Sequence, residues 1–311
     1  KEVQSKFFGT LKNVYNFFTL YANTDQVDPR SYFMPFEQRA ELDLWILSKL
    51  NSLKEKVELD MDQYDLTRAI RRIQDFINED LSNWYIRRSR RRFWETDLTD
   101  DKKAVYSTTF EVLVDICKMV APFAPFLSEE LYKNLTGELS VHLSDYPTAN
   151  PELIDKELEE VMDRVRDLVT LGRSARESAR IKVRQPLQRI YMDGKYEESL
   201  THLVPLMKDE LNVKEVVFEK NLSQYMNFSL KPNFKVLGPV LGPKLRVFSK
   251  ALNDLDPAEY APRLEQGETI KIDLDGEDFE INRDNILITI SAKEGYDVET
   301  ENNLFVILDT S

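Results

Sequence analysis

Five arginines stand within six consecutive positions of the chain, and their side chains suit the recognition of phosphate. The cluster comprises Arg87, Arg88, Arg90, Arg91 and Arg92. A guanidinium group matches the geometry of a phosphate, and aromatic rings stack on unpaired bases. Two tryptophans flank the cluster: Trp84 fits an apolar helix stripe, and Trp94 fits either stacking on a base or burial in the core. The cluster therefore predicts a contact with RNA.

A second basic stretch follows later in the chain. It comprises Arg164, Arg166, Arg173, Arg176, Arg180, Lys182, Arg184 and Arg189. The spacing of residues 173, 176, 180 and 184 predicts that these side chains share one face of a helix. Such a face is solvated, forms ion pairs with acids of the same chain, or lines a groove for RNA phosphates. Composition leaves both interpretations open.

Residues suited to catalysis or metal binding are sparse. The two histidines, His142 and His202, lie 60 positions apart, and neither has a catalytic neighbour. No Gly-rich phosphate-binding loop occurs. The chain has a single cysteine, Cys117, which excludes a Cys-rich zinc site. It also excludes an intramolecular disulfide, and the lack of a disulfide fits a reducing cytoplasm. We expect no active site, no metal and no cofactor in this chain.

The charge of the chain is uneven. The whole sequence has 42 Lys and Arg against 55 Asp and Glu, but residues 251–311 alone hold 16 acidic and 4 basic residues. The acidity of this last part does not argue against a polyanion partner for the rest. No apolar run approaches the roughly 20 residues that span a bilayer, so we expect no membrane segment. The first residues lack Met and a signal-peptide pattern, which predicts a piece of a longer protein.

Residues 1–183 are predicted to form a bundle of long helices. Apolar residues recur every three or four positions, a pattern typical of amphipathic helices, along 11–21, 39–57, 66–93, 100–120 and 158–171. The third helix would span about 30 residues, or roughly 45 Å, with the arginine cluster at its C-terminal end. Asp60 or Asp62 is expected to cap this helix, and Ser128 is expected to cap a shorter one. Long helices with short connections form a bundle.

Residues 184–311 are predicted to form a smaller α/β domain. Asp275-Gly276 signals a hairpin turn, and helices are expected at 197–211 and 244–252. Strands are expected at 190–192, 213–218, 269–274, 279–281, 286–290 and 305–308. The predicted fold class is α+β multidomain, with an N-terminal all-α helical bundle followed by this smaller α/β domain.

Four segments resemble a known family. Residues 83–94 (Asn-Trp-Tyr-Ile-Arg-Arg-Ser-Arg-Arg-Arg-Phe-Trp) and 179–187 (Ala-Arg-Ile-Lys-Val-Arg-Gln-Pro-Leu) resemble signatures of isoleucyl-tRNA synthetases. Residues 121–132 are similar to a helix junction shared by the class I synthetases for Ile, Val, Leu and Met. Residues 230–239 are similar to a segment of the eukaryote-type branch, which some bacteria also carry. The resemblance covers essentially the whole chain, in family order.

The resemblance implies an anticodon-binding bundle followed by part of a C-terminal region. It implies tRNA(Ile) as the partner of a monomeric, cytoplasmic protein, and a parent isoleucine–tRNA ligase that uses ATP and Mg. The His-x-Gly-His and Lys-Met-Ser-Lys-Ser types of motif, which belong to the catalytic domain of the family, do not occur in this sequence. The chain itself is therefore expected to lack the catalytic and editing domains.

The resemblance also implies which residues contact the tRNA. The arginine cluster would meet phosphates of the anticodon stem-loop, Trp94 would lie near a splayed anticodon base, and the second stretch would line the stem. The expected tRNA-binding residues are Arg87, Arg88, Arg90, Arg91, Arg92, Trp94, Arg180, Lys182, Arg184, Asn13 and Asn16. The alternative is a helical protein-interaction scaffold with an acidic tail domain, in which the arginines pair with acids inside the bundle.

Overall fold

The computed structural model describes residues 4–265, 267–274, 276–302 and 304–310, and the chain forms two compact units. The first unit comprises residues 1–162 and the second residues 163–311. The division falls within the helix α7 (Lys156–Ser178). The domain division predicted from the sequence, after residue 183, lies beyond the end of this helix and stays a prediction.

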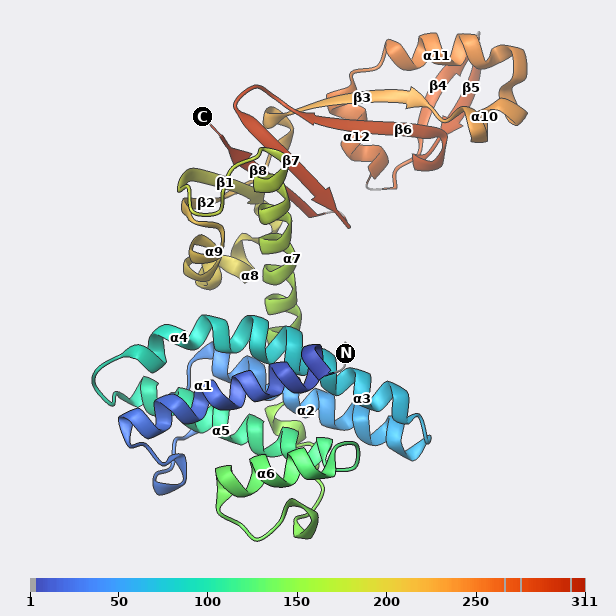
Figure 1. Cartoon of the computed structure of the whole chain (residues 1–311). Coiled ribbons are helices and arrows are strands. Elements are labelled where there is room, and N and C mark those ends of the chain that lie inside the picture. Colours follow the sequence, from blue (N-terminus) through green and yellow to red (C-terminus); the bar gives the residue numbers. More distant parts are fainter. Residues whose placement is uncertain (1–3, 266, 275, 303, 311) are drawn as a thin grey trace. The chain divides into compact units, whose positions relative to one another are not determined.

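The first unit is built from helices, as the sequence predicts (Figure 1). α6 begins at Pro125 with Ala124 as its N-cap, and Ser128 is buried inside it, so the predicted Ser128 cap is wrong. Proline suits this first-turn position because its missing N–H would have no acceptor there. The elements of the unit are a π-helical turn (Gln4–Phe8), α1 (Gly9–Asp25), α2 (Glu41–Asp62), α3 (Leu66–Asp75), a π-helical segment (Phe76–Ile86), α4 (Arg87–Trp94), α5 (Asp100–Val120) and α6 (Pro125–Thr136), with short 3-10 turns at Pro29–Ser31, Phe36–Gln38, Val141–Leu143 and Pro151–Leu153.

One continuous helix carries the arginine cluster at its C-terminal end. It consists of α3, the π-helical segment and α4. Asp65 caps its start by accepting a hydrogen bond from the backbone N–H of Arg68. The predicted caps Asp60 and Asp62 lie instead in the last turn of α2. Because a π-helix bonds residue i to i+5 and has more residues per turn, the segment changes which side chains of α4 face the core.

Aromatic side chains fill the core between α1, α4 and α5. Phe93 of α4 makes edge-to-face contacts with Phe17 and with Tyr106, at ring-centroid distances of 5.1 and 5.0 Å. Phe18 of α1 packs against the same Tyr106. Such pairs contribute about 0.5–1.5 kcal/mol each beyond the burial of their area. Trp84 is also buried, as its place in the apolar stripe predicts.

The second unit combines small sheets with short helices, which confirms the predicted mixed α/β region. Its four-stranded sheet has the order β2-β1-β8-β7, in which β1 and β2 pair in parallel and the other neighbours antiparallel. A parallel pair needs a crossover, which α8 (Glu197–Leu200) and α9 (Val204–Leu211) provide. The strands are β1 (Leu187–Asp193), β2 (Val213–Glu219), β7 (Tyr296–Glu301) and β8 (Leu304–Asp309).

Two strand pairs and three helices of the second unit share a separate apolar core (Figure 1). The predicted hairpin is present: Leu274 pairs with Glu277, and Gly276 has a φ of 91°, which favours glycine. Asp275 lies outside the described residues. β3 and β7 are absent from the sequence-based prediction. The elements are β3 (Met226–Pro232) paired with β6 (Ile286–Ala292), β4 (Ile270–Leu274) paired with β5 (Glu277–Ile281), α10 (Phe234–Leu241), α11 (Leu245–Asn253) and α12 (Pro257–Glu265).

Candidate nucleic-acid interface

The rotation of α4 separates the arginine cluster into an outward and an inward group. Arg90 and Arg91 are exposed, and Arg87 and Arg88 are partly exposed. Arg87, Arg88 and Arg91 also interact with other groups of the chain. The buried face of α4 carries Ser89 and Phe93. The cluster is thus not a single basic surface, and its members need to be considered one by one.

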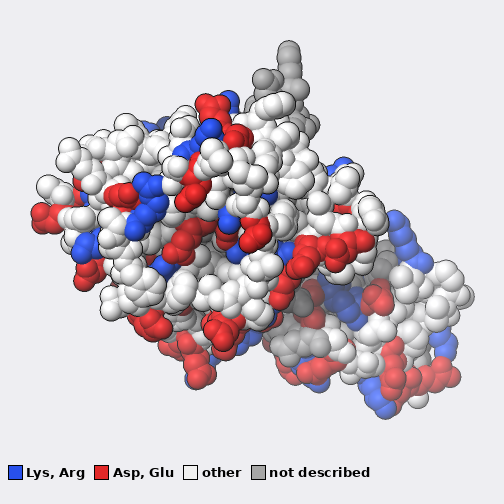
Figure 2. Space-filling view, turned by 90° about the horizontal axis from the view of Figure 1, so that it is seen from below, with Lys and Arg blue, Asp and Glu red and all other residues white. Residues whose placement is uncertain are grey.

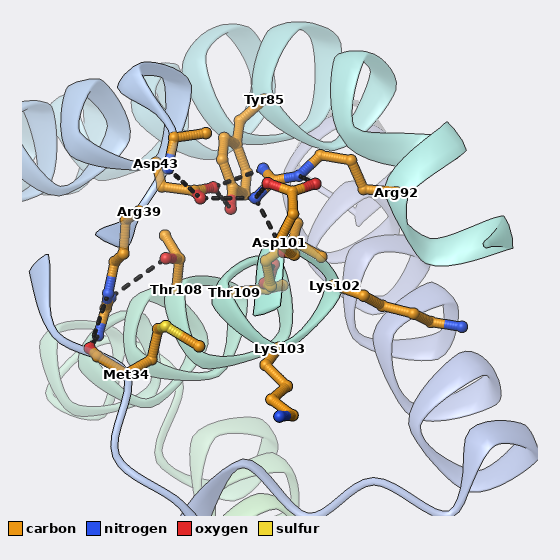
Figure 3. Close-up of polar contacts among 12 residues, drawn as sticks. Met34, Arg39, Asp43, Tyr85, Arg92, Asp101, Lys102, Lys103, Thr108 and Thr109 are labelled. Atoms are coloured by element: carbon orange, nitrogen blue, oxygen red, sulfur yellow. Dashed lines mark hydrogen bonds and ion pairs between the residues drawn. The ribbon is translucent and has the colours of Figure 1, made fainter. Parts of the chain in front are cut away.

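Arg92 forms a buried ion pair with Asp43 of α2 (Figure 3). Its Nη2 lies 2.7 Å from Oδ2 of Asp43 and its Nη1 lies 2.8 Å from Oδ1. Its Nε lies 2.8 Å from Oδ2 of Asp101, at the start of α5. Burial acts to lower the pKa of Arg92, but the hydrogen bonds and charge of Asp43 outweigh it and raise that pKa above its ordinary value. Arg92 therefore holds α2, α4 and the start of α5 together.

Asp43 also binds Tyr85 of the π-helical segment. We call the four residues Asp43, Tyr85, Arg92 and Asp101 the Asp43 cluster. The Tyr85 hydroxyl donates to Oδ1 of Asp43 at 2.6 Å. Burial, and then the neighbouring Asp43 charge, raises the pKa of Tyr85 well above its ordinary value. Removing one partner from such a cluster would leave a buried charge without compensation. The Asp43 cluster therefore fixes the rotation of α4. This rotation turns Arg87, Arg90 and Arg91 away from the core.

Trp94 lies on the surface at the C-terminal end of α4. It is 56% exposed, so the core-burial alternative is wrong. Its Nε1–H donates to the hydroxyl of Tyr21 in α1 at 2.7 Å, which orients the indole ring. Asn13 and Asn16 of the same helix α1 are exposed as well. An exposed indole ring that is held by the hydrogen bond of its N–H suits stacking on a base.

Arg176, near the C-terminal end of α7 in the second unit, is a buried arginine that binds backbone carbonyls. Its Nε donates to the carbonyl of Leu211 at 2.8 Å, and Nη2 donates to that of Asn212 at 2.9 Å. Its Nη1 donates to the carbonyls of Gln185 and Lys182, at 2.9 and 3.2 Å. Burial lowers the pKa of Arg176 from its ordinary value. The four carbonyls supply the polar partners that a buried charge needs.

These bonds hold the segment 179–186, here called the basic loop, in one conformation. The basic loop carries Arg180, Lys182 and Arg184, all of them exposed. Because α7 ends at Ser178 and Arg180 has a φ of 57°, the prediction that residues 173, 176, 180 and 184 share a helix face is wrong for Arg180 and Arg184. Asn212 adds a hydrogen bond from its Nδ2 to the carbonyl of Val183, at 3.0 Å.

Sequence reasoning counts Arg176 among the basic residues but misses its role in positioning the basic loop. A signal for burial is present in the sequence, since Arg176 follows Leu168 and Gly172 at intervals of eight and four residues. Both of these residues are buried on α7. A Cβ at Gly172 would lie 2.6 Å from a methyl carbon of Leu211, so α7 and α9 approach closely there. The carbonyl partners of Arg176 come from distant positions, which spacing alone does not reveal.

The other members of the second basic stretch interact with groups of their own unit. Three of them form ion pairs with acids, and Arg164 contacts an aromatic ring. The contacts are Arg164 over the ring of Tyr196, Arg166 with Asp163, Arg173 with Glu210, and Arg189 with Glu215. Arg189 is exposed as well, and the basic loop holds the exposed cations Arg180, Lys182 and Arg184.

Charge on the face seen in Figure 2 is mixed. Lys and Arg side chains alternate with Asp and Glu, without a continuous basic area. Both histidines, His142 and His202, are exposed. Within the described ranges, no cluster of three or more His, Cys, Asp or Glu side chains is arranged to hold a metal ion. No helix in the described part of the chain is long and apolar enough to cross a membrane.

Comparison with known proteins agrees with this arrangement. A family model described as the anticodon-binding domain of tRNA ligase matches residues 43–191. An isoleucine–tRNA ligase of Clostridium tetani is 42% identical over 317 residues, and that of Clostridium novyi is 43% identical over 320. Both matches cover 100% of this chain and 30% of the relative. An isoleucine–tRNA ligase of Porphyromonas gingivalis is 37% identical over 99% of this chain and 27% of its own length.

The matched residues contain both parts of the candidate interface. Residues 43–191 begin at Asp43, run through α4 with its arginines, and include Arg176 and the basic loop. The chain spans about 30% of the length of the ligases it matches. The helical architecture, the family match and the relatives agree, and the chain corresponds to the anticodon-binding region of isoleucine–tRNA ligases.

Proposed function

We propose that this chain binds the anticodon stem-loop of a tRNA for isoleucine. The observation that carries the proposal is the outward end of α4, where exposed arginines adjoin an exposed tryptophan. The buried Arg92–Asp43 pair fixes the rotation of this helix end before RNA arrives. A preorganised surface loses less conformational freedom on binding than a flexible one.

We assign the contacts residue by residue. Arg87, Arg88, Arg90 and Arg91 bind phosphates, and Trp94 stacks on an unpaired anticodon base. Arg180, Lys182 and Arg184 of the basic loop bind phosphates of the stem, and Asn13 and Asn16 donate hydrogen bonds from α1. Phosphate contacts fix position, whereas the unpaired bases carry the identity of the tRNA. Arg92 takes a positioning role in place of a phosphate contact.

The remaining expectations concern the longer protein. In an isoleucine–tRNA ligase, docking at this region selects the tRNA whose acceptor end reaches a catalytic domain, which uses ATP and Mg and lies outside this chain. We further propose a cytoplasmic monomer, with residues 184–311 as a C-terminal domain that follows the bundle 1–183. Membership of the eukaryote-type branch stays a prediction, and the relatives named above, all bacterial, do not support it.

A fluorescence anisotropy titration tests the proposal. Labelled tRNA(Ile) is compared with a tRNA of another specificity, using the chain and the variant Arg87→Ala/Arg90→Ala/Arg91→Ala. We expect tighter binding to tRNA(Ile) than to the other tRNA. In the variant we expect weaker binding and a salt slope reduced by roughly 0.7 to 0.9 for each lost phosphate contact.

A matched variant controls for the loss of positive charge. Lys56→Ala/Arg71→Ala/Lys133→Ala removes three exposed cations from the same unit but away from α4. It should retain most of the tRNA affinity. If the α4 variant is folded and binds tRNA(Ile) as well as the control does, the arginine cluster of α4 is not the binding site. Equal and weak binding of both tRNAs by the unmodified chain would favour the protein-interaction scaffold.

A further inference from the structure

Trp94 and Tyr21 belong to a closed ring of contacts that joins the ends of α1 and α4. The indole N–H of Trp94 donates to the hydroxyl oxygen of Tyr21, at 2.7 Å. Asp25 lies one helical turn after Tyr21 and is the last residue of α1. Glu95 directly follows Trp94 and is the C-cap residue of α4. The ring closes at Lys102, which binds both Asp25 and Glu95.

Lys102 of α5 is a buried lysine whose side chain points away from the Asp43 cluster (Figure 3). Its Nζ lies 2.7 Å from Oδ2 of Asp25 and donates to the backbone carbonyl of Glu95. The hydroxyl of Tyr106 donates to the same oxygen of Asp25. Burial acts to raise the pKa of Asp25, but the hydrogen bonds from Lys102 and Tyr106 outweigh it and lower that pKa below its ordinary value. Asp25 is therefore ionised at neutral pH, and its pairing with the buried ammonium holds the two helix ends together.

Two aromatic rings of the core hold Tyr21 in place. The ring centroid of Tyr21 lies 4.9 Å from that of Phe17 and 6.2 Å from that of Phe93. Tyr21 is partly exposed and Trp94 is 56% exposed, so both belong to the surface that we propose for RNA. This packing and the ring of contacts fix the Tyr21 hydroxyl beside the indole of Trp94.

The hydroxyl of Tyr21 has a hydrogen that the chain does not use. An indole N–H can only donate, so the Tyr21 oxygen is the acceptor in its bond with Trp94. A phenolic hydroxyl also has one hydrogen of its own to donate. Among the residues that the structure describes, none accepts this hydrogen. A fixed hydrogen-bond donor thus lies beside a ring that suits stacking.

Stacking and hydrogen bonding have different consequences for the choice of RNA. Stacking tolerates any sequence, because every base has a π-face. A hydrogen bond to a base edge depends on the base, since a carbonyl oxygen or ring nitrogen accepts a hydrogen and an amino group donates one. Trp94 alone would therefore bind a base without identifying it, whereas a donor at its side distinguishes one base from another.

We propose that Tyr21 is a specificity-determining residue, which donates its hydroxyl hydrogen to the edge of the base stacked on Trp94, and that Lys102 positions it. The base recognised is one that presents a carbonyl oxygen or a ring nitrogen at this edge. The proposal rests on the proposed tRNA binding and adds to it a discrimination between bases of the anticodon loop.

Tyr21→Phe tests the proposal, because it removes the hydroxyl and keeps the ring. Anisotropy titrations compare tRNA(Ile) with transcripts of it that each carry one substituted base in the anticodon loop. We expect Tyr21→Phe to bind tRNA(Ile) about two- to tenfold more weakly, the effect of one hydrogen bond. At one loop position the substitution should weaken binding to the unmodified chain but not to Tyr21→Phe. The penalties at the other loop positions should remain in the variant.

Tyr64→Phe is the matched control, since it removes a hydroxyl from an exposed tyrosine at the turn between α2 and α3. It should leave both the affinity and the discrimination unchanged. A uniform loss of affinity for all transcripts in Tyr21→Phe, or no loss, overturns the proposal, because the hydroxyl then does not recognise a base. The tRNA proposal stands in that case if the Arg87/Arg90/Arg91 variant still loses binding. No binding of tRNA(Ile) by the unmodified chain overturns both.

Lys102→Met tests the positioning role, because it removes the ammonium and keeps an apolar stem. Trp45 and Trp84 are buried, so fast local motion in time-resolved tryptophan fluorescence anisotropy reports on Trp94. We expect faster motion of Trp94 and loss of the same base discrimination as in Tyr21→Phe. A lysine that only stabilises the fold would change neither in the folded variant, and that result overturns the positioning role. If Lys102→Met does not fold, Tyr21→Phe decides alone.

Discussion

Arginines one or two positions apart on α4 have opposite surroundings, because the helix turns by about 100° for each residue. Arg92 faces inward and meets Asp43, whose side chain is fully buried, whereas Arg90 and Arg91 face solvent. The paired arginine contributes to the fold, and we propose the exposed arginines as the contacts to RNA phosphates. Charge density along the sequence therefore overstates the number of cations that a partner can reach.

Asp43→Asn is expected to destabilise the first unit strongly. The variant removes the buried carboxylate of Arg92 and leaves it only the half-exposed Asp101, and breaking a buried pair costs about 3–5 kcal/mol. Urea denaturation followed by circular dichroism measures the change in the free energy of unfolding. Asp101→Asn is the control, since Asp101 is about half exposed and its loss should cost no more than about 1 kcal/mol. Equal losses in the two variants would show that the buried pair does not hold α4 in place.

Arg176→Lys is expected to loosen the basic loop without changing the net charge. A lysine ammonium is a compact donor and does not reproduce the fork that reaches four carbonyls. We expect faster amide hydrogen exchange across residues 179–186 and a three- to tenfold loss of tRNA affinity, or about 0.7–1.4 kcal/mol. Arg189→Lys, which keeps the charge at an exposed position outside the basic loop, should show neither change. If the amides of residues 179–186 exchange as slowly in Arg176→Lys as in the unmodified chain, Arg176 does not position the basic loop.

At the scale of the elements, the helices could be predicted because their signal is local. Apolar residues every three or four positions reveal α1, α2 and α5 without knowledge of the partners. β3 carries a readable signal as well, since Met226, Phe228 and Leu230 alternate with polar residues, and the prediction overlooks it. β7 has no such pattern: its sequence Tyr-Asp-Val-Glu-Thr-Glu is mostly polar, and it forms through pairing with β8 at the end of the sheet.

The candidate site also has features that the sequence reveals and features that it does not. The basic character of α4 and of the segment after α7 is visible in the sequence, whereas the burial of Ser89 and Phe93 follows from the π-helical segment before α4. The partner of Arg92 cannot be identified from the sequence, because Asp43 lies 49 positions away on another helix. The partners of Arg176 include carbonyls 35 and 36 positions away. Long-range pairing of charges thus decides which arginines face solvent.

The contact between α7 and α2 is expected to depend on pH through Glu159. Its carboxylate accepts hydrogen bonds from Ser48 and Ser52, at 2.6 and 2.5 Å, and pairs with Lys156 at 3.2 Å. Burial acts to raise the pKa of Glu159, but these bonds outweigh it and lower the pKa below its ordinary value. A lowered folded-state pKa means that the stabilisation is present above the unfolded-state pKa, about 4.3, and is lost as pH falls through the folded-state pKa.

Thermal unfolding of Glu159→Gln between pH 7 and pH 3 checks this expectation. At pH 7 the variant should be less stable than the unmodified chain by about 1–3 kcal/mol, since buried hydroxyls lose a charged acceptor. The difference should shrink below about pH 4.3. Glu157→Gln, at an exposed position of the same helix turn, is the control and should change stability little. A difference that stays constant down to pH 3 would contradict the assignment of the pH dependence to Glu159.

At the scale of the whole molecule, the chain combines local basic surfaces with a net charge of −13. Most of that charge lies in residues 251–311, which hold 16 acidic residues. A polyanion is therefore attracted at α4 and the basic loop but repelled by the molecule as a whole. The repulsion by the whole molecule acts over longer distances than ion pairing at α4 and the basic loop. Salt therefore weakens the repulsion more than it weakens the ion pairs. The Debye length falls from about 30 Å at 0.01 M salt to about 8 Å at 0.15 M.

The variant Asp254→Asn/Asp278→Asn/Glu294→Gln separates these two effects. All three acids are exposed and belong to the acidic last part of the chain. We expect the variant to bind tRNA more tightly than the unmodified chain at 0.01 M salt, because less long-range repulsion opposes the approach of the RNA. At 0.15 M salt the two affinities should converge, since charges farther apart than a Debye length are then screened. Anisotropy titrations across this range measure both. A gain in affinity that persists undiminished at 0.15 M would contradict this expectation and would mean that these acids lie within a Debye length of the bound RNA.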